Sequence, residues 1–435
     1  MRKDVDSSHF NTLPGSLMLS SAHAVASAAS ARCLRRHRRQ VARMTARCGP
    51  PGEAVLGSSG DVVDSTVLVA GGGFAGVGAA TILLVAGVDV LLCEQGRGLG
   101  GRVCTRHVRD NRGLAFDHGC QYFAPKQGSP FAEVLVELER QGVVQRWASG
   151  RLGTVECRNQ RLEAFTFTPW EPGKVAWVGV PSMSSVGKHL LLEAAKQPGA
   201  GKLTVALGTR VAPGKLRRDG DAWLADTHAK GTPDERRSTR HAIVLALGSA
   251  SSTANIVSPV SPQLAAPAGR VQANCCWALM VAFVQPIAAG GAQLPFDGCL
   301  VQGSDAIAWM ANNSTKPGRA SGSVECWVVH AAAEWSNARR DADADAVAGE
   351  LLAAFAECMA PAEGMPPVVH REAFRWNAAF PLSVADSGGA ACFVDGQAGL
   401  GLAGDWCVGP RAGDAWHSGS MAAQAVLRTM AGGRV

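Results

Sequence analysis

The chain has 435 residues, of which 47% are hydrophobic and 18% charged, as in a folded protein of two or three domains rather than a disordered one. The net charge of +6 comes from residues 1–60, which hold nine Lys and Arg against three acids and leave 33 basic and 33 acidic residues in 61–435. The neutral charge of residues 61–435 argues against a nucleic-acid partner. The sequence contains no run of about 18 apolar residues, so no transmembrane segment is predicted.

The first 60 residues have the composition of an organelle transit peptide. Between Ser7 and Gly52 there are seven arginines, many serines and alanines, and no Asp or Glu. The abundant serine and the lack of acids favour a chloroplast, and the density of arginine leaves a mitochondrion as the alternative. A disordered basic tail is the plainer interpretation. Pro51–Ser65 then has the composition of a linker.

A βαβ unit is predicted directly after this linker. Thr66–Ala70 is a short β-branched and apolar run of the kind found in buried strands. Phe74–Ala86 is an Ala-rich helix that Gly87 ends, and Asp89–Cys93 is a second strand. A strand, a glycine turn, a helix and a strand within about 30 residues predict a parallel sheet.

The rest of the chain mixes buried strands, alternating strands and helices. The predicted elements are, in order, a strand at Leu203–Leu207, a basic hairpin at Lys215–Arg240, a strand at His241–Leu247, antiparallel strands from Asn274 to Val329, a helix at Asp341–Met359, and a strand, loop and helix over Gly399–Met430.

A G-x-G-x-x-G turn separates the first predicted strand from its helix. In such a turn the first glycine permits a tight bend, the second lets a pyrophosphate approach the backbone, and the third lets the helix pack on the strand. The N-terminus of the helix then faces the phosphates. The cofactor-binding residues predicted here are Gly71, Gly73, Phe74, Ala75 and Gly76.

The segment that begins at Glu94 distinguishes between dinucleotides. Glu94 lies where an acid accepts hydrogen bonds from an adenosine ribose, which both NAD and FAD possess. Gly100 and Gly101 would expose backbone amides to a longer diphosphate, and the planar guanidinium of Arg102 suits phosphate oxygens. An exposed loop is the plainer interpretation of these residues. The segment favours FAD over NAD, because a simple NAD dehydrogenase has no use for residues 96–102.

Together with motifs farther along, these residues resemble the flavoprotein amine oxidase superfamily, and within it the renalase-like branch. The resemblance runs from about Thr66 to Met430 in one order. It is carried by FDHGCQYF (Phe116–Phe123), WVGVPSMSSVGKHL (Trp177–Leu190), WMANNSTKPGR (Trp309–Arg319), VVHAAAEWS (Val328–Ser336), FRWNAAFP (Phe374–Pro381) and GLAGDWCVGPRAGDAWHSG (Gly401–Gly419).

The resemblance implies an α/β fold with non-covalent FAD. Its Rossmann-like FAD-binding domain is assembled from discontinuous segments and accompanies an α+β substrate domain with a mixed or antiparallel sheet. The implied limits are 62–115, 175–255 and 385–435 for the FAD-binding domain, and 116–174 and 256–384 for the substrate domain.

The same resemblance implies further cofactor contacts. Val211 would lie near the adenine, and Gly404 with Asp405 near the ribityl–pyrophosphate region, although Asp405 also suits a plain helix cap or turn. The remaining implied contacts are Gly119, Ala415 and Trp416. Three features depart from the family: Asp414 stands in for an acid at a shifted position, Cys407 does not match the site of covalent attachment, and the segment CCWALMVAFV lacks the lysine of true amine oxidases.

Candidate catalytic residues come from two of the motifs. His118 and Gln121 are predicted near the flavin ring, and Trp309 and Asn312 are predicted to face it from the substrate domain. For His118 a structural, hydrogen-bonded role is the alternative. Thirteen scattered cysteines without a C-x-x-C pair are predicted to be reduced, and no metal site is expected.

The expected activity is that of an FAD-dependent oxidoreductase. It would take a hydride from a small reduced substrate onto the flavin N5 and pass electrons to oxygen or another acceptor. The renalase resemblance suggests a dihydronicotinamide, related to NAD(P)H, as that small-molecule substrate. The alternatives are a plastid amine or polyamine oxidase, and a flavin-binding assembly or sensing protein without turnover.

Overall fold

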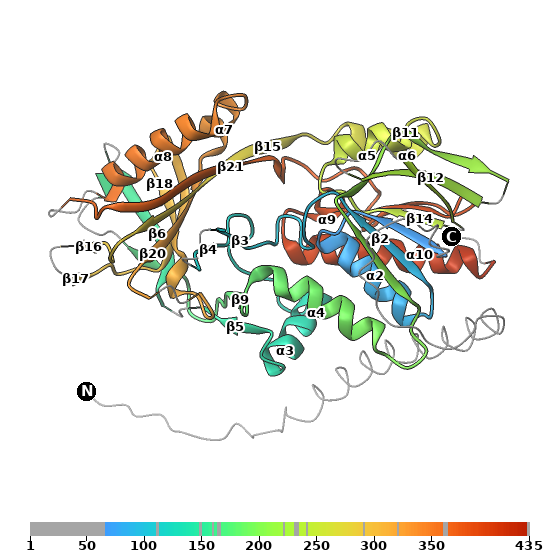
Figure 1. The fold of residues 1–435 in the computed structure, drawn as a ribbon, viewed down its shortest axis with the longest axis horizontal. Coiled ribbons are helices and arrows are strands. Elements are labelled where there is room, and N and C mark those ends of the chain that lie inside the picture. The colour runs from blue at the N-terminus through green and yellow to red at the C-terminus, as the bar shows by residue number, and fades with distance from the viewer. Residues whose placement is uncertain are drawn as a thin grey trace, which may run out of the picture. The chain divides into compact units, whose positions relative to one another are not determined.

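The computed structural model describes residues 66–432, except 110–112, 148–149, 159–160, 163–166, 221, 230–234, 241, 290–291, 320–321 and 360–363. The predicted transit peptide and linker therefore lie outside the described residues. Two large sheets organise the described part, with the short strands β3 (Arg106–His107) and β4 (Ala115–Phe116) between them (Figure 1).

The first sheet confirms the predicted Rossmann-like architecture. Its six strands lie in the order β10-β2-β1-β14-β23-β22, and all are parallel except β22, which runs antiparallel to β23. The strands are β1 (Val67–Ala70), β2 (Val90–Glu94), β10 (Leu203–Leu207), β14 (Ala242–Leu245), β22 (Phe393–Asp395) and β23 (Leu400–Leu402). Strands from three distant parts of the chain thus share one sheet.

Both faces of this sheet are covered, which explains why its central strands are apolar throughout. Val67 and Val69 pack in one cluster with the helices α2 (Phe74–Val85), α4 (Met183–Ala195) and α10 (Ala412–Met430). Leu68 and Ala70 pack in another cluster on the opposite face. That cluster is completed by β11 (Thr209–Asp219), β12 (Ala222–Ala229), α5 (Ala250–Val257) and α6 (Pro262–Gly269).

The predicted basic hairpin is instead part of a three-stranded antiparallel sheet of β11, β12 and β13 (Glu235–Arg240). The predicted strand at Leu203–Leu207 is confirmed, and the predicted hairpin began at Lys215. The structure begins β11 at Thr209, because Val211 and Leu216 are buried beneath the six-stranded sheet.

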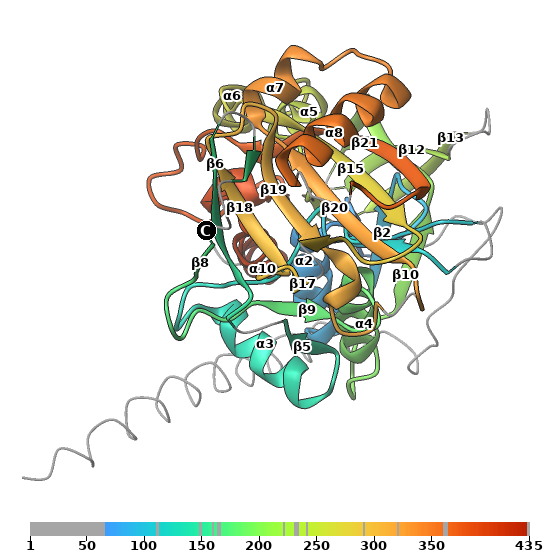
Figure 2. The same ribbon diagram turned by 90° about the vertical axis from the view of Figure 1, so that its left-hand side faces the viewer.

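The second sheet has eight strands, of which seven lie side by side in the order β21-β15-β20-β19-β18-β6-β7. Figure 2 shows β18, β19 and β20 of this sheet next to one another. It is mixed: β18 runs parallel to β6, while the other pairs are antiparallel. The strands are β6 (Leu152–Arg158), β7 (Arg161–Leu162), β8 (Thr168–Pro169), β15 (Ala273–Phe283), β18 (Gly298–Gln302), β19 (Ile307–Asn312), β20 (Glu325–Ala331) and β21 (Val368–Pro381).

Alternation along these strands separates a core face from a site face. Trp327 and Val329 of β20 pack with α8 (Ala344–Met359), which begins three residues later than predicted and lies beside α7 (Ala333–Ala338). Val328 points to the opposite side and packs with Phe116. His330 follows Val328 on that side, which faces the loop after β4.

Shorter elements complete the described chain. They are α3 (Pro130–Arg140), β5 (Val144–Arg146), β9 (Trp177–Gly179), β16 (Ala288–Ala289), β17 (Ala292–Gln293), the 3₁₀ turn η1 (Asn313–Thr315) and α9 (Asp405–Val408). Among the helices that the structure describes, none is long and apolar enough to cross a membrane. Every described cysteine is a free thiol, as predicted, and the described residues contain no cluster of three or more metal-ligating side chains.

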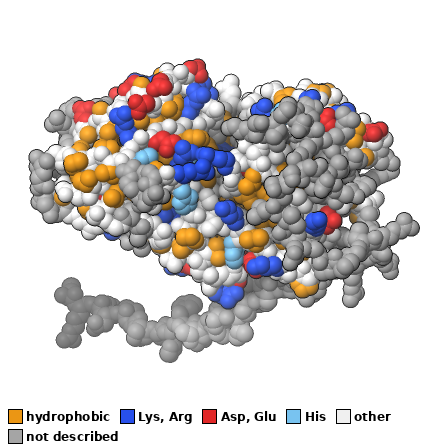
Figure 3. Space-filling model, in the orientation of Figure 1, with side chains coloured by type: hydrophobic (Ala, Val, Ile, Leu, Met, Phe, Trp, Pro, Cys, Tyr) orange, Lys and Arg blue, Asp and Glu red, His pale blue; other side chains and the backbone are white. Residues whose placement is uncertain are grey.

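The surface carries both signs of charge. Acidic side chains gather where Figure 1 places α7 and α8, and basic side chains gather near the middle of the view, beside β3 (Figure 3). Part of the acidic group is neutralised locally, since Asp345 pairs with Arg371 and Asp341 lies 3.5 Å from Arg375.

Candidate functional site

Two glycine-rich turns pack against each other at the carboxyl ends of β1 and β2. Gly100 donates its backbone N–H to the carbonyl of Gly72 at 2.8 Å. Gly101 has a φ of +57°, and a Cβ there would lie 3.1 Å from the Cα of Gly73, so a side chain would separate the turns. A Cβ at Gly73 would meet nothing within 4 Å. The turns form a cradle with bare backbone, the shape that a pyrophosphate requires.

Glu94 closes one end of this cradle. Its two carboxylate oxygens accept hydrogen bonds from the backbone N–H groups of Gly72, at 2.8 Å, and Gly96, at 2.6 Å. The residue is 9% exposed. A carboxylate offers about four lone-pair sites, so two remain for ribose hydroxyls. The geometry is compatible with the predicted ribose contact.

Arg102 joins the second glycine turn to two distant segments. Its guanidinium forms an ion pair with Asp405 at 2.7 Å and donates to the carbonyls of Ala378, at 3.2 Å, and Ala379, at 2.8 Å. Asp405 is buried at the first residue of α9, directly after Gly404, and its carboxylate is the partner of Arg102. Diphosphate binding by Arg102 stays a prediction.

Five further residues that were predicted to contact the cofactor are buried. Phe74 and Ala75 open α2 and are buried, as are Ala415 and Trp416 in the first turns of α10. The indole Nε1 of Trp416 is buried and has no hydrogen-bond partner in the described part of the chain. Val211 is buried at the start of β11. A bare-backbone cradle, an acid at its end and an orphaned buried donor fit FAD.

His118 and Gln121 lie on the loop that follows β4, and the loop contacts the second glycine turn. Cys120 donates its N–H to the carbonyl of Arg102 at 2.8 Å, and a Cβ at Gly119 would collide with that carbonyl. The ring of His118 stacks on Trp376 at 5.0 Å between centroids. The structure thus brings His118, Gly119 and Gln121 next to the predicted cofactor site.

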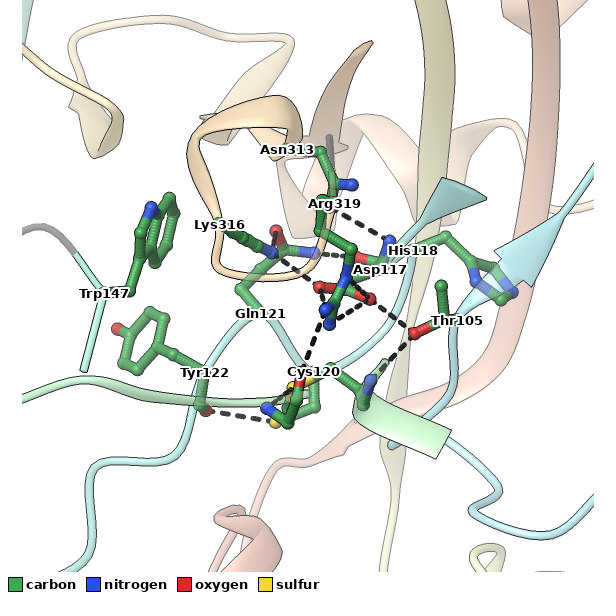
Figure 4. A network of polar contacts seen from close by, with 12 residues as sticks. Thr105, Asp117, His118, Cys120, Gln121, Tyr122, Trp147, Asn313, Lys316 and Arg319 are labelled. Carbon is green, nitrogen blue, oxygen red and sulfur yellow. Dashed lines mark hydrogen bonds and ion pairs between the residues drawn. The ribbon is translucent and has the colours of Figure 1, made fainter. Parts of the chain in front are cut away.

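A buried ionic cluster holds this loop (Figure 4). Asp117, which has no exposed side-chain surface, accepts hydrogen bonds from Lys316 at 3.2 Å, Arg319 at 3.0 Å and the hydroxyl of Thr105 at 2.6 Å. Arg319 also donates to backbone carbonyls at Gly179, 2.9 Å, and at Pro181, 2.6 Å. The cluster therefore ties together segments of chain that lie far apart in the sequence.

Lys316 is the second anchor of Gln121. Its ammonium donates to the side-chain oxygen of Gln121 at 3.1 Å and lies 4.8 Å from the ring centroid of Trp147. The amide nitrogen of Gln121 donates to the carbonyls of Asp117 and Gly119. All the polar atoms of this side chain are engaged by the protein, so its orientation is fixed.

Burial sets the charge states of the cluster. Desolvation lowers the pKa of His118 to about 4, helped by Arg106, so its imidazole is neutral near pH 7. Desolvation also lowers the pKa of Lys316 to about 8. Burial alone would raise the pKa of Asp117, but the charges of Lys316 and Arg319 outweigh that effect and lower it.

The two candidates from the second sheet differ in placement. Trp309 is buried on β19, 5.6 Å from the ring of Tyr122, and its indole Nε1 has no hydrogen-bond partner among the described residues. Asn312 instead donates to the carboxylate of Glu325 and accepts from the N–H of Ser314. Those contacts give Asn312 a structural role, and a flavin-facing role for it stays a prediction.

Sequence reasoning missed the residues that anchor the loop. Asp117, Lys316 and Arg319 all stand in motifs that carry the family resemblance, yet they were assigned no role. A lysine and an arginine around Pro317–Gly318 are typical of an exposed turn. The available signal was the single acid of FDHGCQYF, since an acid beside a buried strand needs a cationic partner.

Comparison with known proteins agrees with this geometry. A model of NAD(P)-binding Rossmann-like domains matches residues 69–138. Over 82 residues the chain is 42% identical to (S)-6-hydroxynicotine oxidase of Paenarthrobacter nicotinovorans. That match covers 19% of this chain and 19% of the relative, so the chain spans about a fifth of the relative's length in the alignment.

Solved structures match over most of the chain. Cyclohexylamine oxidase from Brevibacterium oxydans has a TM-score of 0.59 with 12% identity, over 85% of this chain and 100% of that one. Putrescine oxidase bound to putrescine has a TM-score of 0.59 with 13% identity, over 83% of this chain and 98% of that one. At such identities the likeness concerns the fold.

Proposed function

Because the chain has the fold of the flavoprotein amine oxidases, we propose that it is an FAD-dependent oxidoreductase. The observation that carries the proposal is the bare-backbone cradle of Gly73 and Gly101, closed by Glu94 and by the Arg102–Asp405 pair. A mononucleotide or a simple NAD site would need the first glycine turn and the acid, but not the second turn.

The chain's residues would hold the cofactor without a covalent bond. The N-terminus of α2 and the cradle would take the pyrophosphate, and Glu94 the adenosine ribose. Arg102 and Asp405 would hold the rest of the FAD molecule. FAD would supply the redox chemistry, by accepting a hydride.

The groups on the loop after β4 would orient the reactants. Neutral His118 and the fixed amide of Gln121 would not serve as a general acid or base. Hydride transfer does not require such a residue. Trp309 and Tyr122 would present aromatic faces to a planar substrate. We propose a small reduced substrate, with a dihydronicotinamide as the specific candidate.

Anaerobic mixing tests the substrate. Addition of each dihydronicotinamide isomer to the flavin-loaded full chain should bleach the flavin absorbance within seconds, and admission of oxygen or another acceptor should restore it. A lack of bleaching with every isomer would eliminate this substrate class.

An amine oxidase is the second candidate, and the similar proteins named for amine substrates favour it. Against it, β15 contains no lysine at all, and the buried cluster presents two cations against one carboxylate, which opposes a protonated amine. Hydrogen peroxide release on addition of putrescine or cyclohexylamine, lost when FAD is removed, would favour this candidate over the first.

A flavin-binding protein without turnover is the third candidate. Loss of FAD in an Arg102→Ala variant that keeps its biological role would support it. The proposed location is a plastid, and residues 1–60 fused to a fluorescent protein should direct it to chloroplasts. A mitochondrial signal would support the alternative compartment.

A further inference from the structure

We infer that Lys316 is a positioning residue of the candidate active site: its ammonium fixes Gln121, and its unbalanced charge favours a bound group that carries negative charge. The inference rests on the proposed function, because Gln121 belongs to the site that would face the flavin. Two features of the structure support it independently of each other: the contacts of the ammonium and the charge balance of the cluster.

The contacts of Lys316 are specific to its position. The side chain has no exposed surface, and its ammonium reaches Asp117, Gln121 and the face of Trp147. Two of these partners lie on the loop after β4, while Lys316 itself lies just beyond η1, in the part of the chain that follows β19. The lysine thus holds that loop against the second sheet.

The cluster around it is not electrically balanced. Lys316 and Arg319 share one carboxylate, that of Asp117, and each of the three side chains is at most 1% exposed. Burial of an unpaired charge is strongly unfavourable unless another charge compensates it.

Among the residues that the structure describes, no neighbouring charged or titratable group supplies that compensation. Arg102 and Arg106 are already paired with carboxylates of their own, Asp405 and Glu372. Burial lowers the pKa of His118 and of His330 to about 4, which leaves both imidazoles neutral, and burial raises the pKa of the Cys104 and Cys120 thiols to about 12. Glu94 accepts hydrogen bonds from two backbone amides of the cradle. A ligand that gains negative charge on reduction would be stabilised at this place.

Asp117 and Arg319 have a different part. Arg319 is a bidentate partner of Asp117 and also donates to three backbone carbonyls. The Arg319–Asp117 pair therefore has the structural role of holding the loop after β4 in place. Within the described part of the chain, the Lys316 ammonium bonds to Asp117 and Gln121 and to no backbone carbonyl. Its contribution is the orientation of Gln121 and the extra positive charge.

The midpoint potential of the bound flavin tests the inference, measured by anaerobic dye equilibration on the full-length holoprotein. Lys316→Met should lower the ratio of reduced to oxidised flavin at a fixed solution potential by about tenfold, which is about 30 mV for a two-electron couple. Lys316→Arg should restore the ratio in part, because it keeps the charge. Lys188→Met removes an exposed lysine charge on α4, outside the cluster, and its potential should stay that of the wild type.

Should Lys316→Met fail to fold, Lys316→Gln decides the matter, because its amide can still donate a hydrogen bond to Gln121 while it carries no charge. A lowered potential in either variant supports the inference. An unchanged potential in a folded, flavin-loaded variant overturns it. A wild-type chain that binds no flavin would instead refute the proposed function. That result differs from both a lowered and an unchanged potential in a variant.

Discussion

At the scale of single residues, Arg102 has the most consequential contacts in the cradle. Its side chain is 26% exposed while that of Asp405 is 4% exposed, so its removal leaves a buried carboxylate without its partner. We expect Arg102→Ala to weaken FAD binding and to lower the free energy of unfolding by about 2 kcal/mol.

Arg97 provides the matched control for that substitution. It lies in the same loop, is exposed and has no predicted role. Arg97→Ala should leave flavin content and unfolding unchanged. Equal losses in both variants, measured by flavin absorbance and chemical denaturation, would refute the specific role of Arg102.

From the lowered pKa of His118 we predict that the folded state loses stability at acid pH. Its pKa is about 4 in the folded chain, against an ordinary value of 6.5, so the folded state favours the neutral ring. The stabilising effect is complete above pH 6.5 and is lost as the pH falls from 6.5 to about 4. The loss amounts to about 3 kcal/mol at most.

Denaturation curves between pH 7 and 4 measure this effect. His118→Gln should flatten the decline in unfolding free energy over that range relative to the wild type. Parallel declines in the two proteins would show that His118 is not the group responsible.

At the scale of elements, the packing of α10 on α2 depends on a close backbone approach. A Cβ at Gly419 would collide with the carbonyl oxygen of Ala75, at the start of the helix that would face the pyrophosphate. We expect Gly419→Ala to destabilise the fold by about 2 kcal/mol and to reduce flavin affinity.

A glycine in another helix gives the contrasting case. At Gly349 of α8 an added Cβ would meet only the tip of the Arg371 side chain, at 3.6 Å. Gly349→Ala should therefore stabilise the protein by about 0.5–1 kcal/mol, through helix propensity. In thermal denaturation, the melting temperatures of the two variants should shift in opposite directions from that of the wild type. Shifts in the same direction would contradict the packing argument.

Elements with a strong local pattern were predictable, and those defined by distant contacts were not. The βαβ unit of Thr66–Cys93 was predicted to within a residue or two, because buried parallel strands are apolar and the glycine turn is unambiguous. The strands β11 to β13 are polar and were taken for a single hairpin. Their pairing depends on burial of Val211 and Leu216 under a sheet formed from other parts of the chain.

The same distinction holds for the site. The cradle follows from adjacent residues, so Gly73, Glu94 and Gly101 could be identified from spacing alone. The anchoring of Gln121 by Lys316 joins positions 195 residues apart. No local pattern reveals that a lysine in a proline–glycine turn is buried, which is why the charge cluster escaped prediction.

At the scale of the whole molecule, the Asp117 cluster links segments associated with both sheets. Asp117→Asn would leave Lys316 and Arg319 buried without a counter-charge, and we expect it to lower the free energy of unfolding by about 3–5 kcal/mol. Glu137 pairs with Arg140 on an exposed surface of α3 and serves as the control. Glu137→Gln should leave the chemical denaturation curve close to that of the wild type. A similar small cost for Asp117→Asn would contradict the linking role.

The visible absorption spectrum of the purified full-length chain tests the central claim most directly. We predict flavin bands at about 370 and 450 nm, and release of intact FAD into the filtrate when the protein is denatured. A colourless protein that takes up no FAD on reconstitution would contradict the account, as would a chain that retains NAD in place of flavin.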